Sequence, residues 1–244
     1  MRECGSKGEI LTTQEIAMHF GGLAALKDIN LEIERGSVTG IIGPNGSGKT
    51  TLFNVITGYL KATKGNVYYE EEKITGAKPF EIVNKGIART FQVPQCCKLL
   101  TIQENIRLAC LRAYAGETIE VKTREFAAVA KIDRHLESKA KNVPIGFLRK
   151  TEMAMALATN PRLLLLDEPF SGLTDLECQE FSAIVKGLGE NITLVVIDHK
   201  LKHLMPIVEK VYVLNEGRVF FAGSPEEVAR NRDVQKIYIG GEIQ

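Results

Sequence analysis

Residues 43–50 read Gly-Pro-Asn-Gly-Ser-Gly-Lys-Thr, a glycine-rich stretch that ends in a lysine and a hydroxyl side chain. The apolar residues 38–42 precede it, and residues 50–60 contain no helix breaker except Gly58, so a strand, a loop and a helix are predicted in that order. Glycines let backbone N–H groups close around phosphate oxygens, and the N-terminus of the following helix favours negative charge. The stretch predicts a phosphate-binding loop made by Gly43, Pro44, Asn45, Gly46, Ser47, Gly48, Lys49, Thr50 and Thr51.

Residues 163–169 read Leu-Leu-Leu-Leu-Asp-Glu-Pro, an apolar strand that ends in two carboxylates. Ligands of parallel sheets bind beyond the carboxyl ends of the strands. There Lys49 is expected to reach the β and γ phosphates of a nucleotide, while Thr50 and Asp167 hold Mg²⁺. Glu168 is placed to orient and deprotonate the attacking water. The two stretches predict an ATP-hydrolysing site built on neighbouring strands of one sheet.

A third apolar strand, residues 194–197, is followed by Asp198 and His199. An imidazole at this carboxyl end can hydrogen-bond the γ phosphate and respond to its loss. A lone histidine is more often structural, but its position after such a strand favours the functional interpretation. The other three histidines lack this context and are interpreted as surface or packing residues: His19, His135 and His203.

Composition and charge exclude several classes of protein. The 244 residues are 44% hydrophobic and 25% charged, as in ordinary globular proteins. With 31 basic and 30 acidic residues, the chain carries no basic domain that would point to nucleic acid. The five cysteines lack metal-ligand spacing and are interpreted as reduced cytosolic thiols. Residues 1–9 lack the apolar stretch of a secretory signal, and no run is long enough to span a bilayer, so we expect a cytoplasmic chain.

The rest of the chain alternates between strand and helix patterns. Period-two alternation at residues 29–34 predicts an N-terminal antiparallel strand, and residues 211–222 predict a hairpin. The middle third is helical, with one helix from Thr101 to about Tyr114 and a second over residues 120–140. Two further helices are predicted to begin at capping boxes, after Thr174 and Ser224.

With these stretches placed, the chain resembles the ABC (ATP-binding cassette) ATPases over nearly its whole length. The resemblance implies an α/β fold of the P-loop NTPase class, with a mixed or parallel core sheet, an N-terminal antiparallel β subdomain and a helical subdomain. It implies one domain over residues 1–244. The ATP-binding core is then expected at about residues 9–92 and 160–240, and the helical subdomain at about residues 93–159.

The resemblance also implies roles for single residues. Gln92 resembles the Q-loop glutamine, which in the family contacts Mg²⁺ and the attacking water in a loop that faces the membrane subunit. His199 resembles the switch histidine, and Phe20 falls where the family stacks an aromatic ring on adenine. The D-loop, which in the family crosses to the other protomer of a dimer, corresponds to Ser171, Gly172, Leu173 and Thr174.

Three shorter pieces resemble one subfamily, the ATP-binding subunits of high-affinity branched-chain amino-acid importers. They are Phe20-Gly-Gly22, Arg89-Thr-Phe-Gln92 and Ile237-Tyr-Ile-Gly240. This resemblance implies a peripheral ATPase on the cytoplasmic face of the membrane that docks on separate permease subunits and is served indirectly by a solute-binding protein. The transported solute itself is chosen by the binding protein and the permease, so the cassette sequence does not identify it.

The family's signature segment, usually Leu-Ser-Gly-Gly-Gln, is altered in this chain. The following helix and Asn160-Pro161 align it with Pro144, Ile145, Gly146 and Phe147. Pro144 removes a serine hydroxyl and a backbone N–H, and Ile145 adds a side chain where glycine lets phosphate approach. Losing a hydrogen bond to a charged group predicts a contact to the opposite protomer's ATP that is weaker by about ten- to a hundredfold. We therefore expect a heterodimer with a paralogous cassette, a homodimer being the alternative.

Other functions fit the sequence less well. A regulatory cassette that binds ATP and hydrolyses it weakly is motivated by the altered signature, but Glu168 and His199 argue against it. A P-loop GTPase is disfavoured because Asn84-Lys-Gly-Ile87 lacks the carboxylate of a guanine-reading Asn-Lys-x-Asp. A DNA-repair or chromosome-organising cassette is disfavoured because the chain has no room for a long coiled-coil insertion.

Overall fold

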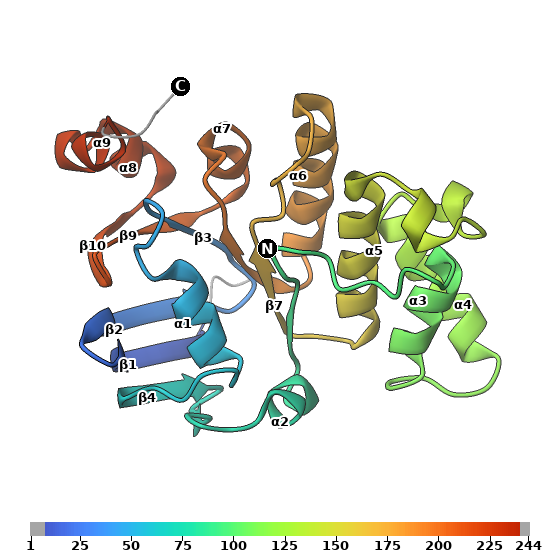
Figure 1. Cartoon of the computed structure of the whole chain (residues 1–244), viewed down its shortest axis with the longest axis horizontal. Coiled ribbons are helices and arrows are strands. Elements are labelled where there is room, and N and C mark those ends of the chain that lie inside the picture. Colours follow the sequence, from blue (N-terminus) through green and yellow to red (C-terminus); the bar gives the residue numbers. More distant parts are fainter. Residues whose placement is uncertain (1–7, 240–244) are drawn as a thin grey trace, which may run out of the picture.

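The computed structural model describes residues 8–239, which form two β-sheets with helices packed against them (Figure 1). The first sheet is antiparallel and has the strand order β2, β1, β4, β5. Its strands are β1 (Glu9–Phe20), β2 (Leu23–Glu34), β4 (Lys64–Tyr69) and β5 (Glu72–Lys73). The predicted N-terminal antiparallel structure is therefore confirmed.

The second sheet is mixed and has the strand order β10, β9, β3, β8, β7, β6. Only β10 runs antiparallel to its neighbour, because it forms the predicted hairpin with β9. The strands are β3 (Val38–Ile42), β6 (Ile87–Arg89), β7 (Leu163–Asp167), β8 (Thr193–Ile197), β9 (Lys210–Asn215) and β10 (Arg218–Gly223). The prediction that the phosphate loop and the acidic strand end follow neighbouring strands is wrong, because the chain crosses through α6 (Asp175–Gly189) and inserts β8 between β3 and β7.

The mixed sheet is buried on both faces, which explains the uninterrupted leucines of β7. Leu163 and Leu165 belong to the core shared with the antiparallel sheet and α1 (Lys49–Ile56), whereas Leu164 and Leu166 belong to a second core shared with the helices. All four leucines are fully buried. Burying both faces holds the carboxyl end of β7, with its two carboxylates, in a fixed place.

A helical subdomain extends from one side of the sheets (Figure 1). It contains α3 (Ile102–Cys110), α4 (Thr118–Val129) and α5 (Ile145–Ala158), which pack on one another. Thr101 and Glu104 form the predicted capping box, but α3 ends at Cys110 instead of Tyr114, and turns follow up to Gly116, whose φ is +59°. The helix predicted over residues 120–140 also ends early, because Lys131 adopts a left-handed φ of +56° after α4.

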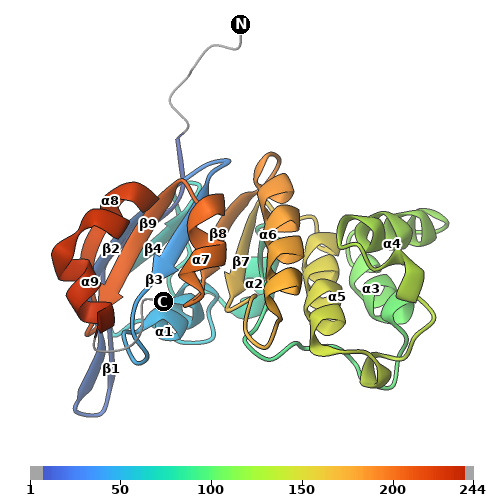
Figure 2. The same ribbon diagram turned by 90° about the horizontal axis from the view of Figure 1, so that it is seen from above.

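The remaining helices cover the mixed sheet on the face away from the antiparallel sheet (Figure 2). They are α6, α7 (Leu201–Leu204), α8 (Pro225–Arg230) and α9 (Arg232–Ile239), while the short α2 (Pro79–Asn84) precedes β6. The capping boxes at Thr174 and Ser224 are both present. Gly240 of the terminal Ile237-Tyr-Ile-Gly240 lies outside the described residues. Within residues 8–239 no helix has the length and apolar content needed to cross a membrane.

Candidate functional site

The glycine-rich stretch links the end of β3 to the start of α1, as predicted. Two of its glycines cannot be replaced without a clash. A Cβ at Gly43 would lie 2.2 Å from the Leu214 carbonyl oxygen, and a Cβ at Gly48 would lie 2.7 Å from the Leu26 side chain. Gly48 also has a left-handed φ of +103° immediately before α1. The loop is therefore tightly wound against β2 and β9, with the N-terminus of α1 at its end.

Lys49 extends back over the loop that precedes it. Its Nζ donates hydrogen bonds to the carbonyl oxygens of Gly43 and Pro44, at 2.7 and 3.0 Å. Burial lowers the pKa of Lys49, and the carboxylates of Glu168, Asp167 and Asp198 oppose that shift. A partly desolvated ammonium in a glycine-rich loop gains strongly from an anion placed beside it.

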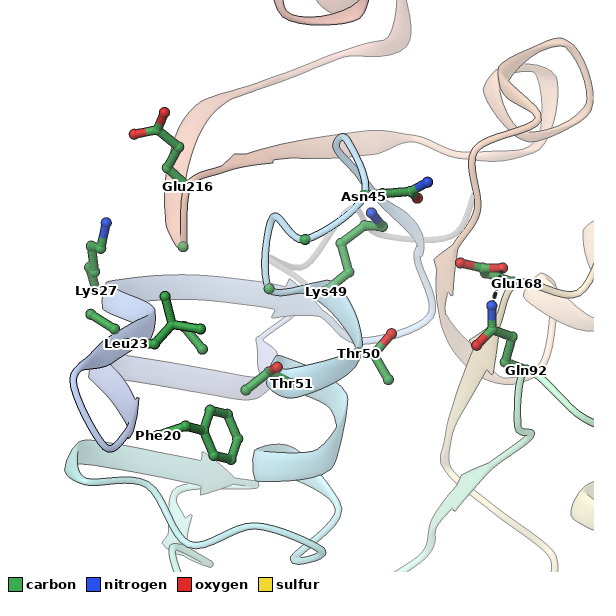
Figure 3. A pocket seen from close by; sticks show the side chains of 15 residues that line it. Phe20, Leu23, Lys27, Asn45, Lys49, Thr50, Thr51, Gln92, Glu168 and Glu216 are labelled. Carbon is green, nitrogen blue, oxygen red and sulfur yellow. Dashed lines mark hydrogen bonds between the residues drawn. The ribbon is translucent and has the colours of Figure 1, made fainter. Parts of the chain in front are cut away.

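A cavity of about 640 Å³ opens beside the loop, a size that suits a small-molecule ligand (Figure 3). Phe20 lies at one end of it, Lys49 and Thr50 lie in the middle, and Gln92 and Glu168 face them from the other side. Phe20, at the end of β1, is 45% exposed, so the ring is free to stack on a planar group. The lining residues are Phe20, Leu23, Ala24, Ala25, Lys27, Asn45, Gly46, Gly48, Lys49, Thr50, Thr51, Gln92, Glu168, Glu216 and Gly217.

Gln92 and Glu168 form a pair at the edge of this cavity. Gln92 Nε2 donates a hydrogen bond of 2.9 Å to Glu168 Oε2 (Figure 3). The backbone N–H of Glu168 donates to Ile197 O at the end of β8, and Glu168 adopts a left-handed φ of +48° that turns the chain after β7. The carboxylate is thereby held in a cavity that Lys49 and Thr50 also line, where a general base for an attacking water is needed.

Asp167 directly precedes Glu168 but is not among the residues that line the cavity, and it is 1% exposed. One of its oxygens, Oδ2, accepts a hydrogen bond of 2.6 Å from Arg89 Nη2. Among the described residues no donor reaches the other oxygen, Oδ1. Burial raises the pKa of Asp167, and Arg89 opposes this shift. Mg²⁺ takes oxygen ligands. The free oxygen of Asp167, the hydroxyl of Thr50 and the amide oxygen of Gln92 are ligands of this kind, so these residues fit the ion.

His199 follows β8 as the sequence suggests, but it does not line the cavity. Its ring is 53% exposed, and its Nδ1 lies 3.9 Å from Asp198 Oδ1 at the end of β8. His203 is buried and contacts Asp175 at 3.0 Å, and the His135 ring contacts the Phe147 ring in a tilted arrangement, at 4.3 Å between centroids. The role of His199 toward a γ phosphate stays a prediction.

The altered signature segment forms the start of α5. Pro144 is the residue before the helix, and no side chain caps the helix N-terminus. Ile145 is 38% exposed, whereas Gly146 is packed so tightly that a Cβ there would lie 2.7 Å from Glu177 Oε1. The D-loop residues Ser171, Gly172, Leu173 and Thr174 lie beside it, where Gly172 approaches the Ile145 side chain. That this helix start corresponds to the family's signature segment stays a prediction.

Comparison with known proteins agrees with this geometry. The protein-family model described as "ABC transporter" matches residues 26–171, which run from β2 to the D-loop. The chain belongs to the ABC transporter family. The cassette is 33% identical to a probable branched-chain amino acid transport ATP-binding protein, LivG, of Archaeoglobus fulgidus, covering 96% of both chains. It is 32% identical to the high-affinity LivG of Escherichia coli, covering 95% of this chain and 98% of that protein.

Solved structures show the same fold. The ADP conformation of MJ1267, an ATP-binding cassette of an ABC transporter, superposes with a TM-score of 0.89 at 34% identity and covers 96% of this chain and 99% of that chain. The dimeric cassette MJ0796 superposes with a TM-score of 0.80 at 28% identity, covering 88% and 98%. This cassette is therefore an ATPase of the ABC type that binds nucleotide.

Two buried charged residues of α5, which sequence reasoning missed, bind the backbone around Gln92 and at Ser171. Arg149 donates to Gln92 O at 3.0 Å and to Ser171 O at 2.8 Å. Glu152 Oε1 accepts from the backbone N–H groups of Phe91 and Gln95, at 3.2 and 3.0 Å. Both side chains lie inside the protein. The only sequence signal was a run of polar residues early in an otherwise apolar helix.

The pKa of Glu152 gives a prediction about stability. Burial raises it from 4.5 to about 7, although the backbone N–H groups of Gln95 and Phe91 favour the charged form. The folded state therefore holds the proton more tightly than the unfolded state, so this contribution to stability is fully present below pH 4.5 and is lost as the pH rises through about 7. Between about pH 5 and pH 8, the wild type should lose about 1–3 kcal/mol of stability relative to Glu152→Gln, which keeps an acceptor oxygen without a charge.

Urea denaturation across that pH range measures this difference. The exposed residue Glu190 provides the control, because Glu190→Gln should follow the wild-type pH dependence. Parallel curves for the wild type and Glu152→Gln would show that Glu152 does not take up a proton on folding.

Proposed function

We propose that this cassette binds and hydrolyses ATP to power the import of branched-chain or related amino acids, at the cytoplasmic face of a membrane. The hydrolytic part rests on the cavity that gathers the phosphate loop, Gln92 and Glu168. The substrate class rests on the LivG proteins, which are similar to this chain over nearly their whole length. Residues 1–244 act as one cassette, with a core at about residues 9–92 and 160–240 and a helical subdomain at about residues 93–159.

Each residue of the site has a proposed task. Phe20 stacks on adenine, and the loop backbone with Thr51 surrounds the phosphates. Lys49 binds the β and γ phosphate oxygens. Thr50, Gln92 and Asp167 hold Mg²⁺, which when bound neutralises phosphate charge.

Hydrolysis is assigned to Glu168. Its carboxylate accepts a proton from the water that attacks the γ phosphorus, and the amide of Gln92 keeps the carboxylate oriented toward the cavity. The bond that breaks joins the γ phosphorus to the oxygen bridging to the β phosphate, so the products are ADP and inorganic phosphate. His199 is assigned to the γ phosphate, as a donor that responds to its release.

Membrane permease subunits are the proposed partners. Large apolar side chains stay exposed where the chain leaves the Q-loop and along α3, namely Val93 (69%), Leu99 (73%), Leu108 (53%) and Leu111 (52%). Clustered exposed apolar residues of this kind mark interaction surfaces. A solute-binding protein acts on the permease and reaches the cassette only indirectly.

A second cassette completes the assembly, and we propose a heterodimer. The motivating observation is Pro144 before α5, which lacks both the hydroxyl and the backbone N–H that a serine would offer to the partner's nucleotide. The site on this chain's own phosphate loop then turns over against an intact partner signature, and the other site mainly binds. The same observation favours the second candidate function, a weakly hydrolysing regulatory cassette.

Reconstitution into liposomes tests the proposed function. The chain is combined with the permeases, the solute-binding protein and the second cassette of the proposed assembly. We expect leucine, isoleucine or valine to stimulate ATP hydrolysis and to be taken up. Omitting the second cassette should abolish the stimulation, since this chain's own signature is altered. Equal rates with and without it would reject the heterodimer, and no hydrolysis in the full assembly would favour the regulatory cassette.

A further inference from the structure

Arg89 connects three parts of the site that are far apart in the sequence. It is the last residue of β6, the edge strand beside β7, three positions before Gln92. Its side chain is only 5% exposed, and that of Asp167, its ion-pair partner 78 positions away, is 1% exposed. The guanidinium therefore lies inside the protein, beside the residue that directly precedes Glu168, and not at the surface.

Each end of the guanidinium has a different partner. Nη2 donates to Asp167 Oδ2 at 2.6 Å. Nη1 donates to Asn54 Oδ1 at 2.7 Å and to Thr57 Oγ1 at 3.2 Å, at the C-terminal end of the phosphate-loop helix α1. The planar group thus ties the carboxylate of Asp167 to the helix that begins with Lys49.

Two aromatic rings hold this guanidinium between them. Its central carbon lies 5.4 Å from the centroid of the Phe53 ring and 5.1 Å from that of Phe91. Phe91 belongs to the Q-loop, directly before Gln92. A cation held between two rings and two hydrogen-bonded ends has little freedom to move.

Stability alone does not explain this arrangement. A buried ion pair costs desolvation that its attraction often fails to recover, and an apolar pair of similar volume is frequently as stable. Here the pair is also incompletely satisfied, because Arg89 Nε and Asp167 Oδ1 have no hydrogen-bond partner among the described residues. Unpartnered buried polar atoms in a native site call for an explanation other than packing.

We propose that Arg89 is the positioning residue for the metal end of the site, an inference that rests on the proposed function. By holding Oδ2 of Asp167, it aims Oδ1 at the Mg²⁺ that accompanies ATP, and it fixes this carboxylate at a set position relative to α1 and the Q-loop. Partners that orient a metal ligand in this way strongly affect metal affinity.

The test measures binding of a fluorescent nucleotide, trinitrophenyl-ATP, by the full chain across a Mg²⁺ titration and without metal. Arg89→Lys keeps the charge, but a single ammonium cannot bridge Asp167 and Asn54 as the planar fork does. We expect its binding without Mg²⁺ to stay at the wild-type level, while the Mg²⁺ concentration for half-maximal enhancement rises by about tenfold or more. Arg35→Lys, which alters a half-exposed pair with Glu70, is the matched control and should change neither value.

Asn54→Ala serves as a second variant, because it removes the shorter of the two hydrogen bonds that anchor Arg89 at the end of α1 and leaves Arg89 paired with Asp167. It should raise the Mg²⁺ requirement by less than Arg89→Lys does. An unchanged or lower requirement in Arg89→Lys overturns the proposal. If Arg89→Lys misfolds and fails to bind the probe without Mg²⁺, the proposal is judged on Asn54→Ala instead. An unchanged Mg²⁺ requirement in Asn54→Ala then overturns the proposal. A wild type that does not bind the probe with Mg²⁺ rejects the proposed function on which this role depends.

Discussion

Glu168→Gln is expected to reduce steady-state ATP hydrolysis by about 10²–10⁴-fold, the usual contribution of a general base. Glutamine has nearly the shape of glutamate and keeps a side-chain oxygen that accepts from Gln92, so the cavity should be preserved. What it lacks is a carboxylate that can take the proton of the attacking water. Because ATP still binds, the variant should trap the nucleotide and lengthen the lifetime of the cassette dimer.

Two measurements check this expectation: phosphate release by the assembled complex, and the elution volume of the ATP-bound cassettes in gel filtration. Glu216→Gln provides the control, because Glu216 lines the same cavity on the side away from Glu168 (Figure 3). The control should hydrolyse ATP at the wild-type rate. Unchanged turnover in Glu168→Gln would show that another group accepts the proton.

Lys49→Met should weaken ATP binding by about a hundredfold or more, since hydrogen bonds to charged groups contribute about 1.5–3 kcal/mol each and Lys49 is expected to make at least two. Methionine keeps much of the side-chain volume and favours a helix, so α1 should still form. The loss should be larger for ATP than for AMP, because AMP lacks the phosphates assigned to Lys49.

Isothermal titration calorimetry with ATP and AMP measures both affinities. Lys64→Ala is the control: Lys64 is an exposed residue of the antiparallel sheet, paired only at the surface with Glu15, and its removal should leave the affinity intact. Equal weakening for ATP and AMP would mean that Lys49 supports the loop without contacting the terminal phosphates.

Local sequence chemistry predicted much of this fold correctly. Gly43 and Gly48 are required by backbone contacts that a Cβ would violate, so the glycine pattern identified the loop. The three capping boxes at Thr101, Thr174 and Ser224 all form, because each involves only four consecutive residues. Helix ends were less predictable. Lys131 follows α4 in a left-handed conformation, but it is not a glycine, so the sequence does not mark this helix end.

Relations between distant segments were not predictable in the same way. The position of β8 between β3 and β7 depends on how α6 crosses over the sheet, which no local pattern encodes. The contact between Arg89 and Asp167 joins an edge strand to its neighbour across 78 positions. The burial of Arg149 and Glu152 follows from the loops that cover α5, although charged residues on a helix are usually exposed.

The hydrogen bonds of α5 have a consequence for hybrid cassettes. Glu152 accepts from Phe91 in the proposed ATP-binding core and from Gln95 in the proposed helical subdomain, and Arg149 of the same helix donates to Gln92 O. A chimera that exchanges residues 93–159 for those of another cassette therefore cuts through a shared set of bonds. The exchanged segment must therefore come from a cassette whose corresponding helix carries a carboxylate and a guanidinium at these two positions. Only then would the new subdomain form these hydrogen bonds with the original segment around Gln92.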